Sequence, residues 1–171
     1  MKIAILGFSG SGKSTLARRY ADYYQIPSLH LDTVQFISGW QTRPDDEAKE
    51  IVKEAIAQDS WVIDGNYRRY YQAERLARAD QIVILLFPRL VTLKRIVKRY
   101  WTYRGKSRPD MAEGCPEKLD WEFLWWILHK GRTPKIRKHY LAIQQQYPNK
   151  TIVIRRPAEL DELYYSLRAS L

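Results

Sequence analysis

The sequence predicts one α/β domain in which helices cover both faces of a parallel sheet. Short apolar runs that favour strands alternate with longer segments of helical periodicity along all 171 residues. The run Gln81 to Phe87 is typical of a strand buried on both faces. A glycine-rich segment lies directly after the first apolar run and before the first predicted helix. Strand, glycine-rich loop and helix in this order indicate a phosphate-binding domain.

Five segments are predicted to be strands, with helices between them. The predicted strands are Lys2 to Leu6, Ser28 to Leu31, Trp61 to Ile63, Gln81 to Phe87 and Thr151 to Ile154. The predicted helices are Lys13 to Tyr24, a segment from Pro44 with acidic residues 45–47 in its first turn, Tyr70 to Arg78, Pro88 to about Tyr103, Trp121 to Tyr147 with a break near Gly131 and Pro134, and Pro157 to Leu171. After Asp32, a loop is expected through Gly39 and Trp40.

The glycine-rich segment 7–14 fits the P-loop pattern G-x-x-x-x-G-K-[ST]. Its glycines let successive backbone N–H groups converge on phosphate oxygens, and the next helix directs its N-terminus at the same anion. Lys13 is expected to reach the β and γ phosphates, and Ser14 to ligate Mg²⁺. The pattern therefore predicts a nucleoside triphosphate and Mg²⁺ as ligands. The residues expected to contact the nucleotide are Gly7, Ser9, Gly10, Ser11, Gly12, Lys13, Ser14 and Thr15.

Two aspartates are predicted to lie at the carboxyl edge of the sheet. Asp64 ends the third strand beside the P-loop, where it can hold Mg²⁺ directly or through water, although Asp-Gly also marks ordinary turns. Asp32 follows the second strand, where a carboxylate can accept or orient the proton of a phosphoryl acceptor. A cap on a helix or turn explains Asp32 equally well.

The net charge of +10 is concentrated in one part of the chain. Residues 89–140 contain 14 Lys and Arg against 5 Asp and Glu, whereas the rest of the chain contains 15 against 14. Such a block suits a polyphosphate, a nucleic acid backbone or solvent. Arg95 and Arg99 share a helix face, Arg104 and Arg108 continue into an irregular segment, and Arg132 and Arg137 follow it. Arginines around a loop predict a lid at about 104–120 that closes over a triphosphate.

Composition excludes several other classes. No apolar run approaches the roughly 20 residues that span a bilayer, and the N-terminus reads as a strand instead of a signal peptide, so a cytoplasmic protein without a membrane partner is expected. Cys115 is the only cysteine, which excludes an internal disulfide and a multi-cysteine zinc site. The three histidines, His30, His129 and His139, lack a ligand spacing and are expected in surface or packing positions.

The P-loop, Asp64-Gly65 and the segment 95–99 together resemble the adenylate kinase-like branch of the P-loop kinases along nearly the whole chain. The segment 64–67 and the Tyr/Trp-rich basic region look closest to bacterial DNA topology modulation (FlaR-like) proteins. The resemblance implies a P-loop NTPase three-layer sandwich with strand order 2-3-1-4-5, a mobile lid, and an acceptor-side insertion at about 33–59. It also implies ATP and Mg²⁺ as cofactors. It assigns catalytic roles to Lys13, Arg95, Arg99 and Arg137, with Arg132 a looser match.

The chain departs from that family at the acceptor side. Nucleoside monophosphate kinases carry Gly-aromatic-Pro-Arg after the third strand, whereas this chain reads Gly65-Asn66-Tyr67-Arg68-Arg69. Arg68 or Arg69 could substitute, or both could be exposed helix-start residues. Phe36, Trp40 and Arg43 could form an acceptor pocket, with packing the more ordinary role for the two aromatics. The aromatic stripes 20–24 and 121–126 fit core or interface positions better than base stacking.

Two functions of different classes follow. The first is a kinase that transfers the γ-phosphoryl of ATP to a nucleoside-like or nucleotide-like small molecule. The second is a nucleic acid-binding or regulatory ATPase whose basic block contacts phosphate backbones. A signal GTPase fits poorly because segment 149–152 lacks the aspartate of the guanine motif. The acceptor, the base preference and the oligomeric state stay open, and Arg155 and Arg156 are candidates for bordering the base.

Overall fold

The computed structural model describes residues 1–106, 110–117 and 119–169. Its centre is a five-stranded sheet in the order β2-β5-β1-β6-β7, in which every neighbouring pair is parallel. The strands are β1 (Lys2–Gly7), β2 (Ser28–His30), β5 (Trp61–Asp64), β6 (Gln81–Leu85) and β7 (Thr151–Ile154). Along the chain this is the order 2-3-1-4-5, so the predicted P-loop NTPase fold is confirmed.

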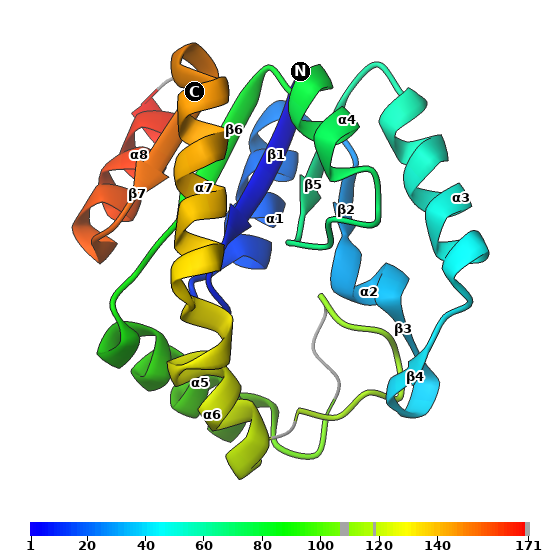
Figure 1. Cartoon of the computed structure of the whole chain (residues 1–171), viewed down its shortest axis with the longest axis vertical. Helices are drawn as coiled ribbons and strands as arrows, with labels where there is room; N and C mark the ends of the chain where they lie inside the picture. Colours follow the sequence, from blue (N-terminus) through cyan, green and yellow to red (C-terminus); the bar gives the residue numbers. More distant parts are fainter. Residues whose placement is uncertain (107–109, 118, 170–171) are drawn as a thin grey trace.

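Alternating strand residues divide the core into two layers. Ala4 and Leu6 of β1 belong to a cluster with helices α3 (Asp45–Ala57), α4 (Gln72–Arg78) and α7 (Pro134–Gln146). Ile3 and Ile5 belong to the cluster on the other face, with α1 (Lys13–Tyr24) and α8 (Pro157–Ala169). Figure 1 shows these helices in front of and behind the sheet. Every strand can therefore be apolar on both sides.

The elements at the carboxyl ends of the strands enclose the space next to the P-loop. On one side lie α2 (Leu31–Gln35) and a hairpin of β3 (Phe36–Ile37) and β4 (Gln41–Thr42), joined by η1 (Ser38–Trp40). On the other side lie α5 (Arg89–Tyr103) and α6 (Trp121–Leu128), followed by η2 (Lys130–Arg132). Figure 1 shows the two groups facing each other below the sheet. A short η3 (Pro148–Lys150) precedes β7.

The expectation of a plain loop after Asp32 was wrong. Leu31 and Val34, three positions apart, are both buried, so one helical turn packs these residues before the chain enters the hairpin. Gly39 has φ +72° and turns the chain between β3 and β4. The predicted helix from Tyr70 begins two residues later, because Tyr71 has φ +49° and acts as the N-cap of α4.

Residues 110–117 of the predicted lid lie against this hairpin. The N–H of Gly39 donates to the carbonyl of Gly114 at 3.0 Å, and Trp40 Nε1 donates to the carbonyl of Pro116 at 3.2 Å. Cys115 is a buried free thiol whose Sγ donates to the carbonyl of Ile37 at 3.1 Å. Through these contacts, residues 110–117 cover the space between the two groups of elements. Lid residues 107–109 and 118, Arg108 among them, and the expected helix end at 170–171 lie outside the described residues.

Across the part of the chain that the structure describes, each helix is too short or too polar to cross a membrane.

Replacement of Gly7 is expected to destabilise the fold. Gly7 has φ +139°, and a Cβ at this position would lie 2.2 Å from the carbonyl oxygen of Leu85 in β6. Strain and overlap with backbone together predict that Gly7→Ala lowers the free energy of unfolding by about 2 to 4 kcal/mol, measured by urea denaturation. Gly39→Ala is the matched control, because Gly39 also has a positive φ but no atom of the described residues lies within 4 Å of the point its Cβ would occupy. Equal losses in the two variants would contradict the close-approach argument.

Candidate active site

The P-loop is a turn whose own side chains hold its shape. Ser11 is fully buried, and its Oγ donates to the carbonyl of Phe8 at 2.7 Å. Lys13 Nζ donates to the carbonyls of Gly7 and Phe8 at 3.3 and 3.1 Å, so its ammonium lies across the loop. Helix α1 begins after Gly12, which has φ +94° and provides no side-chain cap. The first N–H groups of α1 are thus directed at whatever anion the loop holds.

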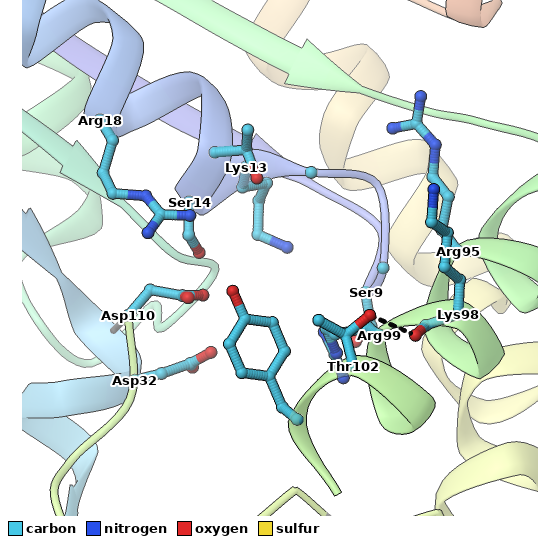
Figure 2. A pocket seen from close by; sticks show the side chains of 14 residues that line it. Ser9, Lys13, Ser14, Arg18, Asp32, Arg95, Lys98, Arg99, Thr102 and Asp110 are labelled. Atoms are coloured by element: carbon cyan, nitrogen blue, oxygen red, sulfur yellow. Dashed lines mark hydrogen bonds between the residues drawn. The ribbon is translucent and has the colours of Figure 1, made fainter. Parts of the chain in front are cut away.

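A cavity of about 320 Å³ opens over this loop. Of the residues expected to contact the nucleotide, Ser9, Gly10, Gly12, Lys13, Ser14 and Thr15 line it, whereas Gly7 and Ser11 lie in the loop beneath. Its other lining residues are Arg18, Asp32, Arg95, Lys98, Arg99, Thr102, Tyr103 and Asp110. Figure 2 shows basic groups around most of the cavity, with Asp32 and Asp110 on one side. Five basic and two acidic side chains make its lining complementary to a polyphosphate.

Asp64 links the P-loop to strand β2. It is buried at the end of β5, where one carboxylate oxygen accepts from Ser14 Oγ at 2.9 Å and the other contacts His30 Nδ1 at 2.5 Å. Burial alone would lower the pKa of His30, but the hydrogen bond and charge of Asp64 outweigh burial and raise that pKa above its ordinary value. His30, expected in an ordinary position, instead orients this carboxylate.

The oxygen atoms of Ser14 and Asp64 fit a Mg²⁺ ion that is bound mainly by the phosphates of a substrate. A hydroxyl and a carboxylate, from Ser14 and Asp64, lie side by side next to the cavity. Mg²⁺ in such enzymes takes one or two protein oxygens and completes its shell with phosphate oxygens and water. Within the described ranges, no three His, Cys, Asp or Glu side chains gather in a group that could hold a metal ion without a substrate.

Asn66 fastens the segment after β5 to the P-loop. Its Nδ2 donates to the carbonyl of Gly7 at 2.8 Å, and its Oδ1 accepts from the N–H of Gly7 at 3.1 Å. The hydroxyl of Tyr140 in α7 also donates to Oδ1 at 3.1 Å. Burial raises the pKa of Tyr140, so the hydroxyl keeps its proton for this bond. One amide side chain therefore joins β1, β5 and α7 at the carboxyl edge of the sheet.

A buried arginine shapes the backbone of the same segment. Arg75 has no exposed surface, and its guanidinium donates to the carbonyls of Tyr70, Gly65 and Tyr67 at 2.9, 3.5 and 3.0 Å. Burial lowers the pKa of Arg75 to about 10, which still leaves it protonated at neutral pH. Arg75 thereby fixes the turn that presents Asn66 and Tyr67.

Asp32 lies in the first turn of α2 and faces the cavity over the P-loop. Its Oδ1 accepts a hydrogen bond from the hydroxyl of Tyr67 at 2.8 Å, and α2 has no side-chain cap. Burial, followed by the nearby charge of Asp32, raises the pKa of Tyr67, so the phenol remains a donor. The geometry thus gives Asp32 a fixed orientation toward the cavity.

Two of the four predicted catalytic arginines lie at the P-loop cavity. Arg95 donates to the carbonyl of Ser11 at 3.0 Å, and its guanidinium carbon lies 4.6 Å from the centre of the Phe87 ring. Arg99 pairs with Glu117 of the lid segment, with its Nε and Nη2 at 2.8 and 2.6 Å from one carboxylate oxygen. Both come from α5, one helical turn apart, as the sequence spacing predicted.

The other two, Arg132 and Arg137, lie at a different cavity of about 690 Å³. The guanidinium of Arg132 is buried and donates to the carbonyls of Ile127 and Phe87 and to Thr92 Oγ1, at 3.0, 2.7 and 2.7 Å. Burial, then the nearby charges of Arg89 and Arg137, lowers the pKa of Arg132 to about 10. This second cavity is also lined by Arg89, Arg155 and Arg156, together with apolar side chains.

A third cavity, of about 420 Å³, lies between the hairpin, the lid segment and α6. Its walls are aromatic: Phe36, Trp40, Tyr67, Phe123 and Trp126. It shares Ser9, Asp32 and Arg99 with the cavity over the P-loop, so the two spaces meet at these residues. Phe36 and Trp40 thus line the cavity while packing edge to face on each other, with ring centres 5.4 Å apart.

The other candidate acceptor-binding residues lie elsewhere. Arg43 donates to the carbonyl of Val34 at 2.9 Å, which fixes the hairpin instead of facing the cavity. Arg68 and Arg69 line an open hollow on the surface, which adjoins the aromatic cavity at Phe36 and Tyr67. Of the aromatic stripes, Tyr20 is in the core, whereas Trp121, Trp125 and Trp126 are exposed to 77%, 46% and 40%.

Several site residues were not singled out from the sequence. Asn66, Arg18, Lys98 and Asp110 meet at the site from distant segments. Asn66 follows a predicted strand and belongs to the segment 64–67 that carries the family resemblance, whereas His30 had only its place near the end of a predicted strand as a signal. Arg18 lies on α1, with Ser14 one turn before it on the same side of the helix. That spacing could have identified Arg18 as a further phosphate-facing cation.

Comparison with known proteins places the chain near adenylate kinases. It is 27% identical to an adenylate kinase of Clostridium kluyveri over 58% of both chains, and 28% identical to adenylate kinase 2 of a Nostoc species over 64% of this chain and 71% of that one. An adenylate kinase of Bifidobacterium longum is 27% identical over 70% of this chain and 78% of that one. The chain thus spans 58% of the length of the Clostridium relative. No protein-family model matches.

A solved structure of an uncharacterized protein from Eubacterium ventriosum has the same fold. The two superimpose with a TM-score of 0.52 at 18% sequence identity. The superposition covers 98% of this chain and 99% of that one. Fold, P-loop and sequence similarity together support a P-loop kinase-like protein that binds nucleotide.

Loss of the Asn66 side chain is expected to loosen the P-loop. Asn66→Ala removes two hydrogen bonds to Gly7 and one from Tyr140, so the N–H of Gly7 loses the Asn66 acceptor while its carbonyl keeps the bond from Lys13 Nζ. We expect the free energy of unfolding to fall by about 2 kcal/mol, measured by urea denaturation. Asn149→Ala, at an exposed position in η3, should change it by less than about 0.5 kcal/mol. An equal effect of both variants would show that Asn66 does not fasten the loop.

Proposed function

We propose that this chain is an ATP- and Mg²⁺-dependent kinase of a small molecule. The observation that supports this function best is the meeting of two cavities at Asp32. One cavity is basic and lies over a P-loop, and the other is aromatic and suited to an organic acceptor. A carboxylate at their junction stands where a phosphoryl group would pass from donor to acceptor.

The P-loop residues would bind the triphosphate. Backbone N–H groups of residues 9–15 and the N-terminus of α1 would hold its oxygens, with Lys13 at the β and γ phosphates. Ser14 and Asp64 would hold Mg²⁺, and His30 fixes the orientation of Asp64. Bound there, Mg²⁺ would neutralise charge on the phosphates.

Asp32 would orient the acceptor and take its proton. In the transfer, an acceptor oxygen forms a bond to the γ-phosphorus, and the bond between that phosphorus and the oxygen bridging to the β-phosphate breaks. ADP leaves with the electron pair of the broken bond. The acceptor proton passes to the carboxylate of Asp32, which Tyr67 holds in place.

The arginines of α5 would stabilise the charge that develops during transfer. Arg95 and Arg99 line the cavity over the P-loop, and Arg99 also links α5 to the lid segment through Glu117. Arg137 would bind the nucleotide from the second cavity. Arg155 and Arg156 line the same cavity and would border the base. Arg132 would act on the site through Phe87 and Thr92, which its guanidinium holds.

Within the P-loop kinases, we propose that the chain belongs to the FlaR-like branch and acts in the cytoplasm. The segment 64–67 that carries the resemblance to this branch supports the proposal, because three of its residues bind the candidate site. Asp64 accepts from Ser14, Asn66 from the N–H of Gly7, and Tyr67 donates to Asp32. A nucleic acid-binding ATPase is the weaker candidate. Three arginines of the basic block, Arg95, Arg99 and Arg132, make contacts inside the molecule, which removes them from a surface for phosphate backbones.

Removal of the P-loop ammonium tests the proposal that ATP is consumed. Lys13→Ala should abolish acceptor-dependent ADP formation, with a loss on the order of a hundredfold or more, because the charge on the transferred phosphoryl is no longer neutralised. Lys53→Ala, at an exposed site on α3, is the matched control and should keep full activity. Undiminished turnover in Lys13→Ala would rule out this kinase mechanism.

Replacement of the junction carboxylate tests the role of Asp32. Asp32→Asn keeps an acceptor for the Tyr67 hydroxyl but cannot take a proton, so kcat should fall on the order of a hundredfold while the KM for ATP stays unchanged. Asp22→Asn, on the exposed side of α1, is the control and should leave both constants unchanged. A normal kcat in Asp32→Asn would show that no general base is needed from this residue.

A further inference from the structure

The charges around the two cavities differ in sign, which bears on the acceptor. The cavity over the P-loop has Lys13, Arg18, Arg95, Lys98 and Arg99 against two aspartates. The charged residues of the aromatic cavity are Asp32, Glu117, Asp120 and Arg99. Its lining is therefore acidic, with three carboxylates against one guanidinium. That guanidinium is already paired with Glu117, whose side chain is only 3% exposed.

From this lining we infer that the acceptor is a hydroxylated aromatic compound without a phosphate, and that a protonated amine on it is favoured over an anionic group. The inference rests on the proposed kinase function and names the substrate class of its acceptor site. A phosphate on the acceptor carries a charge of about −1.5 to −2 and would be repelled by the carboxylates of this cavity.

The aromatic walls select for a ring. Phe36 and Trp40 pack edge to face on the hairpin side, and Phe123 and Trp126 are parallel on the α6 side, with ring centres 6.5 Å apart. Tyr67 completes the wall beside Asp32. A planar ligand can stack on such faces, and a cation gains further from their π electrons. The volume of about 420 Å³ falls in the range of small-molecule sites.

The carboxylates have distinct positions for this ligand. Asp32 is shared with the cavity over the P-loop, so it suits the reacting hydroxyl. Asp120 caps α6 by accepting from the N–H of Phe123 at 2.8 Å, and it also lines the aromatic cavity. A carboxylate has further acceptor sites beyond one such bond, so Asp120 suits an amine on the ligand.

Arg68 and Arg69, the arginines that stand where related kinases hold the acceptor phosphate, are not among the residues that line this cavity. Arg68 and Arg69 line the open hollow formed with Gln35, Phe36, Thr42 and Tyr67. Arg69 is also engaged by Asp45 at 3.1 Å and by the hydroxyl of Tyr70 at 3.2 Å. An acceptor phosphate held by Arg68 or Arg69 would therefore lie outside the aromatic cavity, in the hollow that adjoins it at Phe36 and Tyr67.

The test compares matched acceptors with and without a phosphate. ADP formation from ATP and Mg²⁺ is measured with pyridoxamine, cytidine and adenosine, and with pyridoxamine 5′-phosphate, CMP and AMP. Binding of the same six compounds is measured by calorimetry in the presence of a non-hydrolysable ATP analogue. We expect binding and turnover with the unphosphorylated members, pyridoxamine above all. Binding or turnover confined to the phosphorylated members, or binding of none of the six, would overturn the inference.

A charge-removing variant tests the amine preference separately. Asp120→Asn keeps the helix cap, since asparagine caps as well as aspartate, but removes one negative charge. The KM for pyridoxamine should rise roughly three- to fivefold, with the KM for cytidine unchanged. Glu122→Gln, an exposed neighbour in α6, is the control and should change neither. An unchanged KM for pyridoxamine in Asp120→Asn would refute the role of this carboxylate.

The two proposals fail in different ways. Should CMP or AMP be phosphorylated while the unphosphorylated compounds are not, the kinase function stands and the inferred acceptor class is wrong. Should the protein fail to bind the ATP analogue, the kinase function itself is wrong.

Discussion

The paired hydrogen bonds between the Asn66 side chain and the backbone of Gly7 are the constraint on which the site depends. They join the end of β5 to the first residue of the P-loop, at the point where β1 and β6 approach too closely for any side chain at position 7. Arg75 fixes the backbone on the β5 side, and the hydrogen bond from Ser14 to Asp64 adds a second link in the first turn of α1. The phosphate-binding loop is therefore held from both of its ends, which places its N–H groups before any ligand arrives.

This fixed edge separates the two environments that the proposed phosphoryl transfer needs. On one side, cations from α1 and α5 surround the P-loop. On the other, the hairpin, the lid segment and α6 surround the second space with aromatic rings and carboxylates. Asp32 belongs to both, and Tyr67 sets its orientation from the segment after β5. The same segment therefore positions the phosphate loop through Asn66 and the junction carboxylate through its next residue.

The sequence carried enough information for the sheet and the P-loop, but less for the surrounding elements. Strands such as β7 and helices such as α1 were predicted to the residue, because apolar runs and glycine punctuation are local signals. The hairpin at 36–42 was missed, since its strands have two residues each and gain stability from the lid segment through Trp40 and Cys115. Asn66 and His30 were missed as site residues for the same reason, because their partners are distant in sequence.

The basic block shows why net charge alone does not indicate a partner. From the sequence, residues 89–140 suit a nucleic acid as well as a polyphosphate. In the fold, Arg132 is buried against backbone carbonyls, Arg99 pairs with Glu117, and Arg95 contacts the P-loop. Each of these side chains is held by a particular neighbour, whereas a surface that tracks phosphate backbones presents its cations to solvent. Arg95 and Arg99 lie at the cavity over the P-loop and Arg132 lies at the second cavity, so these three cations do not form one surface that could track a phosphate backbone.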